Sequence, residues 1–203
     1  MDYTTNIFPY KIQLKFKKLF SDLSSLENIF FKKKNIFKPT FVFGSPRSGT
    51  SLVTKIIFDT KEFGSILQKD MPFLSLPIFW SYFSKIYYLG SKKIKRFHNK
   101  SLNLSVDTAD AFEEVYWPFC LENYENLFMK ELDQYKINIG KLELSLKHFI
   151  KKILFLRKKS YYLSKNNLNF LRCKVIQKIF PDSRFVYCIR NPIDVVYSLK
   201  KLD

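Results

Sequence analysis

Apolar strands and amphipathic helices alternate at both ends of this chain. The apolar run at residues 40–43 ends at Gly44, and the apolar positions between 52 and 57 then follow a helical period. Residues 161–203 read as strand, helix, strand and helix, whereas residues 73–158 have mostly helical spacing. This order predicts an α/β fold, with a parallel sheet flanked by helices and interrupted by a large helical insertion. Ligands of such sheets bind beyond the carboxyl ends of the strands.

The N-terminal segment has a different pattern. Within residues 11–38, apolar side chains from Phe16 to Phe30 fall near a helical period and lysines surround them. We expect this stripe to pack on the domain, and contact with an anionic membrane surface through residues 11–38 is the alternative. The chain therefore divides into a basic amphipathic helical segment, 1–38, and an α/β domain, 39–203.

The most informative segment is Gly44-Ser-Pro-Arg-Ser-Gly-Thr-Ser51, directly after the first strand. Gly44 and Gly49 permit sharp turns with no side chain in the way, so successive backbone N–H groups can point at one anion. The N-terminus of the following helix adds partial positive charge at the same place. The segment therefore predicts a phosphate-binding loop for an oxyanion of phosphate or sulfate type, the alternative being an ordinary surface turn.

This loop differs from the one that binds nucleoside triphosphates. That loop requires Gly-x-x-x-x-Gly-Lys-Ser/Thr, and here Thr50 occupies the lysine position. The cation of the loop is instead Arg47, whose planar guanidinium can grip a tetrahedral anion through two hydrogen bonds. Hydrolysis of ATP or GTP is disfavoured, and a small-molecule kinase built on the same loop remains an alternative function.

A second segment lies near the end of the chain. Residues 184–189 form a short apolar strand that ends at Arg190, and Asn191 and Pro192 are typical of the cap and first position of a helix. Ser198 follows eight residues after Arg190. Taken alone, Arg190 could equally pair with any nearby carboxylate.

Together, the two segments resemble sulfotransferases that use 3′-phosphoadenosine 5′-phosphosulfate (PAPS), in a bacterial-type branch with a P-loop-like fold. The loop is similar to the one that holds the 5′-phosphosulfate, and Arg190 and Ser198 match the pair that holds the 3′-phosphate. The resemblance thus implies PAPS as co-substrate, and it assigns its binding to Ser45, Arg47, Ser48, Gly49, Thr50, Ser51, Arg190 and Ser198.

Three stretches between the two segments, 69–73, 96–117 and 162–182, also resemble this family. The resemblance implies an acidic residue near the acceptor, three positions before a tryptophan, which makes Glu114 the first candidate for the general base. Glu113 is the second candidate, and His98 is the alternative. The family further implies an acceptor hydroxyl on a carbohydrate or glycolipid.

The composition of the chain says less about its function than the two motifs do. The net charge of +17 comes mostly from scattered lysines, so it does not by itself indicate specific nucleic-acid binding, and it suits an anionic nucleotide and a glycan acceptor. The three cysteines lack metal-ligand spacing and there are two histidines, so we expect no metal site and reduced thiols. The first residues do not read as a signal peptide, which favours a cytoplasmic protein.

The resemblance also raises a question about the end of the chain. Sulfotransferases normally continue with another helical segment after the helix that carries the 3′-phosphate serine, whereas this sequence ends at Asp203. We therefore expect the domain to be incomplete at its C-terminus, and a truncated, inactive sulfotransferase-like protein is a further alternative.

Overall fold

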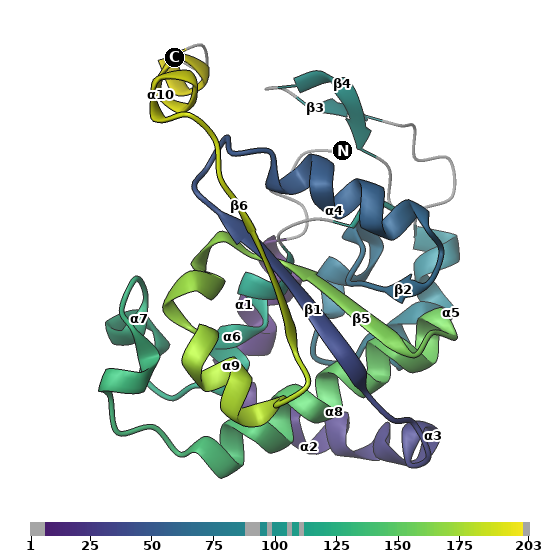
Figure 1. Ribbon diagram of the computed structural model, residues 1–203. Coiled ribbons are helices and arrows are strands. Elements are labelled where there is room, and N and C mark those ends of the chain that lie inside the picture. The colour runs from purple at the N-terminus through teal and green to yellow at the C-terminus, as the bar shows by residue number, and fades with distance from the viewer. Residues whose placement is uncertain (1–6, 88–93, 97–98, 105–106, 110–111, 201–203) are drawn as a thin grey trace.

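The computed structural model describes residues 7–87, 94–96, 99–104, 107–109 and 112–200. Its centre is a parallel sheet in the order β2-β5-β1-β6, with helices on both faces (Figure 1). The predicted α/β class is thus confirmed, and the first strand is longer than the apolar run suggested. The strands are β1 (Phe37–Gly44), β2 (Phe63–Gly64), β5 (Tyr161–Lys165) and β6 (Arg184–Cys188).

Successive side chains of each strand point to opposite faces of the sheet. Phe41 and Tyr162 belong to the main core with side chains of α8 (Ile139–Arg157) and α9 (Cys173–Ile179). Val42 and Leu163, one position further along each strand, form a smaller cluster against α4 (Thr50–Asp59). The sheet is therefore covered on both faces, by α4 on one side and by α8 and α9 on the other (Figure 1).

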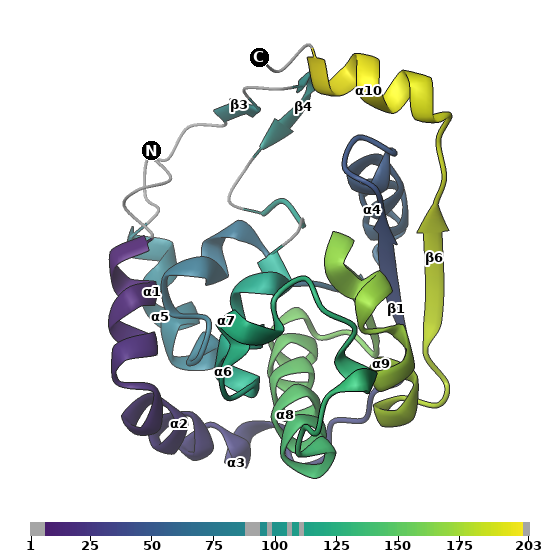
Figure 2. The ribbon, with the colours of Figure 1, turned by 90° about the vertical axis from the view of Figure 1, so that its left-hand side faces the viewer.

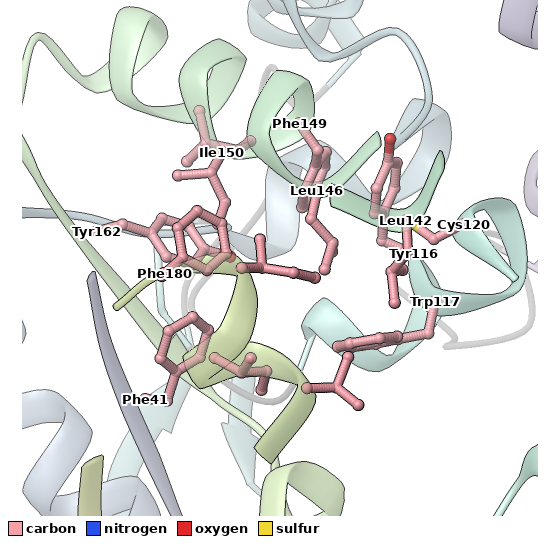
Figure 3. Packing of buried hydrophobic residues seen from close by; sticks show 14 of the residues in the cluster. Phe41, Tyr116, Trp117, Cys120, Leu142, Leu146, Phe149, Ile150, Tyr162 and Phe180 are labelled. Atoms are coloured by element: carbon pink, nitrogen blue, oxygen red, sulfur yellow. The ribbon is translucent and has the colours of Figure 1, made fainter. Parts of the chain in front are cut away.

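The main core ties the helical insertion to the sheet. Tyr116 stacks on Phe149 of α8, with ring centroids 3.6 Å apart and an angle of 10° between the ring planes. Trp117, which is almost completely buried, lies beside them (Figure 3). The segment around Tyr116 is consequently fixed against α8 and β5. This segment carries two of the candidate bases, Glu113 and Glu114.

The predicted insertion at residues 73–158 contains helices, including α8, together with an antiparallel strand pair that the sequence did not indicate. This pair joins β3 (Ile94–Arg96) and β4 (Asn99–Leu104). Besides α8, the insertion contains the helices α5 (Pro77–Tyr87), α6 (Trp117–Cys120) and α7 (Tyr124–Leu127) and the 3₁₀ turns η3 (Phe112–Val115) and η4 (Leu132–Gln134), and the 3₁₀ turn η2 (Gln68–Phe73) precedes it. After β5 come a further 3₁₀ turn, η5 (Asn167–Leu171), and α9, and the last helix is α10 (Pro192–Lys200).

The N-terminal segment forms three consecutive helices, α1 (Ile7–Lys15), α2 (Lys17–Leu26) and α3 (Asn28–Phe31). The expectation that its apolar stripe packs on the domain is wrong for α2, which buries none of its residues. Polar groups of α2 face the domain instead: Lys17 Nζ donates to the carbonyl oxygens of Pro118 and Leu121 at 2.7 and 3.0 Å. The apolar stripe is therefore left on the solvent side.

Two further features concern the helices and the cysteines. Within the residues that the structure describes, no helix has both the length and the apolar character needed to cross a membrane. Cys120, Cys173 and Cys188 are all free thiols, and Cys120 and Cys188 are buried.

Candidate functional site

The carboxyl ends of three neighbouring strands meet at one edge of the sheet. Gly44, at the end of β1, is in register with Cys188, at the end of β6, and Val42 is in register with Lys165, at the end of β5. The loop after β1 and Arg190 after β6 therefore lie at the same edge, where ligands of parallel sheets bind.

The loop itself has the backbone geometry of an anion site. Arg47 and Gly49 both adopt positive φ angles, 68° and 94°, on either side of Ser48. Alternating conformations of this kind turn successive N–H groups toward a common point. Helix α4 then begins at Thr50, and Gly49 O accepts from the N–H groups of Leu52 and Val53 at 2.9 and 3.1 Å. The N-terminal end of a ten-residue helix is thus directed at the loop.

Ser48 and Gly44 make the strongest case that the loop receives a ligand. Ser48 is 92% buried, since only 8% of its surface is exposed, and its Oγ has no hydrogen-bond partner among the described residues. A side chain at Gly44 would place a Cβ 2.7 Å from Ser48 Oγ and 2.5 Å from the carbonyl oxygen of Cys188. Glycine therefore permits the close approach of β6 and Ser48 at this position, and the unsatisfied hydroxyl of Ser48 is left to donate a hydrogen bond to an oxyanion.

The two predicted binding segments contact each other directly. Arg47 Nε donates to Ser198 Oγ of α10 at 2.8 Å, and Arg190 Nη1 donates to Arg47 O at 3.3 Å. Asn191 caps α10 as predicted, because its Oδ1 accepts from Ile193 N at 2.9 Å. Arg190 also lies 3.8 Å from Asp194, in a largely exposed pair. Two guanidinium groups and one hydroxyl thus gather beside the loop.

The remaining loop positions differ in their surroundings. Ser45 is exposed, and its carbonyl oxygen accepts from Ser48 N at 3.1 Å. Thr50 is buried, with its Oγ1 3.5 Å from Asn167 Oδ1, and Ser51 lies in the first turn of α4. Thr50 and Ser51 thus place two hydroxyl groups in the first turn of α4, and Ser45 places another in the loop before it.

A chain of contacts leads from β1 to the first candidate base. Asn166, directly after β5, donates its N–H to Val42 O at 3.1 Å, and its side-chain amide donates to Glu114 Oε2. Glu114 also forms a two-bond ion pair with Arg172, at 2.7 and 2.8 Å. Arg172 in turn lies over the ring of Trp117, 4.3 Å from its centroid.

Glu114 has one hydrogen-bond acceptor position that no described contact uses. A carboxylate offers about four lone-pair sites. Asn166 and one nitrogen of Arg172 use two of them on Oε2, and a second nitrogen of Arg172 uses one on Oε1. The side chain is also 24% exposed.

Glu113 points the other way, into the core. Tyr162 Oη donates to its Oε2 at 2.8 Å, and Trp117 Nε1 lies 3.4 Å from its Oε1. Burial raises the pKa of Glu113, and hydrogen bonds from Ser164 and Tyr162 offset part of this rise. This carboxyl group is therefore a structural anchor between the insertion and β5. The third candidate, His98, lies outside the described residues.

Sequence reasoning missed Lys165. It is buried at the carboxyl end of β5, and its charge lowers the pKa of the Cys188 thiol, although burial raises that pKa more strongly. The signal was a lysine that ends an apolar strand, Tyr-Tyr-Leu-Ser-Lys, at the ligand edge of the sheet. Lys165 adds a further positive charge close to the loop.

The segment 69–73 has a structural role at Asp70. Its carboxylate accepts from Leu67 N at 2.7 Å and pairs with Arg157 of α8. Lys69 pairs with Asp107 at 2.7 Å.

Among the described residues, no group of three or more His, Cys, Asp or Glu side chains is arranged to hold a metal ion.

The described residues thus form an α/β fold in which a glycine-bounded loop and two arginines lie at the carboxyl ends of neighbouring parallel strands. The model of the sulfotransferase family matches residues 39–202, so the chain belongs to that family. No curated protein matches it.

Two solved structures share the fold. Sulfotransferase STF9 from Mycobacterium avium is 13% identical, with a TM-score of 0.55 over 90% of this chain and 50% of its own. Sulfotransferase STF1 from Mycobacterium tuberculosis H37Rv is 12% identical, with a TM-score of 0.56 over 91% of this chain and 54% of its own. The chain thus spans about half the length of these similar proteins.

Proposed function

We propose that this protein transfers a sulfuryl group from PAPS to an acceptor hydroxyl on a carbohydrate or glycolipid. The observation that carries the proposal is the contact between the two binding segments, in which Arg47 donates to Ser198 at 2.8 Å. One nucleotide with phosphate groups at both its 5′ and 3′ positions needs such a pair of adjoining anion sites. A ligand with a single phosphate would use only one of them.

The donor would lie across the carboxyl ends of β1 and β6. The loop backbone from Ser48 to Ser51 and the unsatisfied hydroxyl of Ser48 would hold the 5′-phosphosulfate. Arg190 and Ser198 would hold the 3′-phosphate. A guanidinium carries five N–H donors and the bond to Ser198 uses one of those on Arg47, so Arg47 can contact the phosphosulfate as well.

During transfer, the bond from sulfur to the phosphate oxygen breaks and a bond from sulfur to the acceptor oxygen forms, leaving 3′,5′-ADP. Negative charge then grows on the phosphate oxygen that departs. Arg47, together with Lys165 at the end of β5, would stabilise that charge from fixed positions.

The acceptor hydroxyl loses a proton in the same reaction. Glu114 is the proposed base, because it is partly exposed, is joined through Asn166 to β1, the strand that carries the loop, and has an acceptor position left on Oε1. Its pair with Arg172 fixes the carboxylate in one orientation, which favours a defined position for the acceptor. Glu113 is less suited, since its carboxyl group is buried against Tyr162.

The direct test is to incubate the protein with PAPS and a panel of sugars and glycolipids, and to follow 3′,5′-ADP by chromatography and the acceptor by mass spectrometry. The proposal expects 3′,5′-ADP in step with a mass increase of one sulfuryl group, and neither product with Arg47→Ala. Transfer of phosphate from ATP to the same acceptors, without transfer from PAPS, would instead indicate a kinase.

A further inference from the structure

Helix α2 presents its apolar residues to solvent. Leu19 and Leu26 are 56% and 57% exposed, and Leu23 lies between them on the same stripe. A surface helix normally turns such a stripe toward the core, so this orientation requires a cause.

Buried polar contacts fix the orientation. Lys152 of α8 donates to Ser24 O at 2.8 Å and pairs with Glu27 at 3.0 Å, with both charged side chains almost completely buried. Glu27 also accepts from Phe79 N at 2.7 Å. Rotating α2 to bury its leucines would pull Ser24 and Lys17 away from these partners and leave buried charges unpaired, which is costly. These buried contacts therefore keep the apolar stripe of α2 exposed to solvent in the folded protein.

A second exposed apolar stripe lies on α5, next to α3. Phe30 of α3 packs against Phe79 of α5 with ring centroids 6.3 Å apart. From Phe79, the residues three, four and seven positions further on α5 are Tyr82, Phe83 and Ile86, which are 66%, 64% and 75% exposed. We call the surface formed by Leu19, Leu23, Leu26, Tyr82, Phe83 and Ile86 the α2–α5 face.

The rim of this face is basic. Lys15, Lys18, Lys32 and Lys33 are all exposed along the N-terminal helices. Residues 7–34 contain two acidic residues, Asp22 and Glu27, and Glu27 is buried with Lys152. The exposed charge next to the apolar stripe is therefore strongly positive.

We propose that the α2–α5 face binds the surface of a membrane that contains anionic phospholipids. Apolar side chains on one side of a helix, with lysines beside them, are the combination that inserts into the headgroup region while the lysines contact lipid phosphates. The same charges disfavour a second copy of this chain as the occupant, since pairing the faces would bring like charges together.

The position of the face fits this role. Helices α2 and α3 lie at the end of the molecule opposite α10 in both views (Figures 1 and 2). The loop and Ser198 belong to the α10 end. A protein bound through the α2 part of this face would hold its anion site away from the membrane, open to the aqueous phase.

The test is co-sedimentation of the protein with vesicles of phosphatidylcholine alone or mixed with phosphatidylserine, in the absence of nucleotide. We expect binding to the mixed vesicles and about tenfold weaker binding, or none, to phosphatidylcholine alone. Leu19→Ser/Leu23→Ser and Lys32→Glu/Lys33→Glu should each abolish most of the binding. The matched controls are Leu144→Ser, at a leucine of α8 that is 58% exposed, and Lys136→Glu/Lys178→Glu, at exposed lysines elsewhere, and both should bind like the parent.

Three results would overturn the proposal. The first is no binding to mixed vesicles. The second is equal loss in the control charge reversal, which would mean that the overall charge of +17 attracts the vesicles without a defined face. The third is a dimer in solution that Leu19→Ser/Leu23→Ser dissociates, with no vesicle binding, which would identify a second copy as the occupant. Because no nucleotide is used, the outcome is independent of the proposed sulfuryl transfer.

Discussion

Arg47 and Ser198, 151 positions apart in the sequence, are joined by a hydrogen bond of 2.8 Å from Nε to Oγ. This bond brings together two segments that could each have been an ordinary turn or helix start. The proposed function depends on that contact.

Replacing Arg47 should weaken nucleotide binding without unfolding the protein. Hydrogen bonds to charged groups contribute about 1.5–3 kcal/mol, so Arg47→Ala should lower the affinity for 3′,5′-ADP by about tenfold or more, measured by calorimetry. Arg47→Lys should restore only part, because it lacks the planar fork. Lys55→Ala, at an exposed cation of α4 paired with Asp59, is the control and should bind like the parent. Parent-like binding by Arg47→Ala would make the loop a simple turn.

Gly44 and Gly140 should respond in opposite ways to alanine. At Gly44 the new Cβ would lie 2.5 Å from the carbonyl oxygen of Cys188, so β6 must shift, and we expect a loss of about 1–3 kcal/mol in unfolding free energy. At Gly140, in the first turn of α8, the nearest atom is 3.6 Å away, and alanine should be neutral or stabilise by up to about 1 kcal/mol. Urea unfolding measures both. A tolerated Gly44→Ala with normal nucleotide affinity would show that the close approach of β1 and β6 is not required.

Glu114→Gln should lower sulfuryl transfer by about a hundredfold or more, the usual scale for a lost general base. The substitution also leaves Arg172 with a neutral partner, so the affinity for 3′,5′-ADP is measured alongside and should stay near that of the parent. Glu113→Gln should reduce turnover much less, because that side chain faces Tyr162. A nearly active Glu114→Gln together with an inactive His98→Ala would assign the base to His98.

The buried carboxyl of Glu113 should give stability a pH dependence. Burial raises its pKa above the ordinary 4.5, so between that pH and the higher folded-state value the folded protein holds a proton that the unfolded chain has lost. The folded state therefore loses stability through this group as pH rises across that interval. Glutamine does not titrate, so Glu113→Gln should gain stability relative to the parent between pH 4 and pH 8 in urea unfolding. A difference between variant and parent that does not change with pH would refute this.

The parts of the site that sequence reasoning predicted are the local ones. The spacing of Gly44 and Gly49 and the cap at Asn191 act over a few residues, so the loop and the start of α10 can be read from the chain. The alternation of strands and helices predicted that both segments lie at the carboxyl ends of parallel strands, but it did not indicate the strand order that makes β1 and β6 neighbours. The structure adds the direct contact.

What the sequence could not show depends on long-range pairing. The outward stripe of α2 follows from the ion pair of Glu27 with Lys152, which lies far along the chain, and periodicity alone gives the opposite orientation. The different roles of Glu113 and Glu114 likewise follow from Tyr162 and Arg172, which contact one each. Adjacent carboxylates cannot be told apart until their partners are known.

The central claim is that one nucleotide with phosphates at both ends spans the loop and α10. Titration of the protein with 3′,5′-ADP and, separately, with 5′-AMP by calorimetry tests it most directly, because the two ligands differ only in the 3′-phosphate that Arg190 and Ser198 would bind. The account predicts at least about tenfold tighter binding of 3′,5′-ADP, and a preference that is reduced in Ser198→Ala. Equal affinities for the two nucleotides would contradict it.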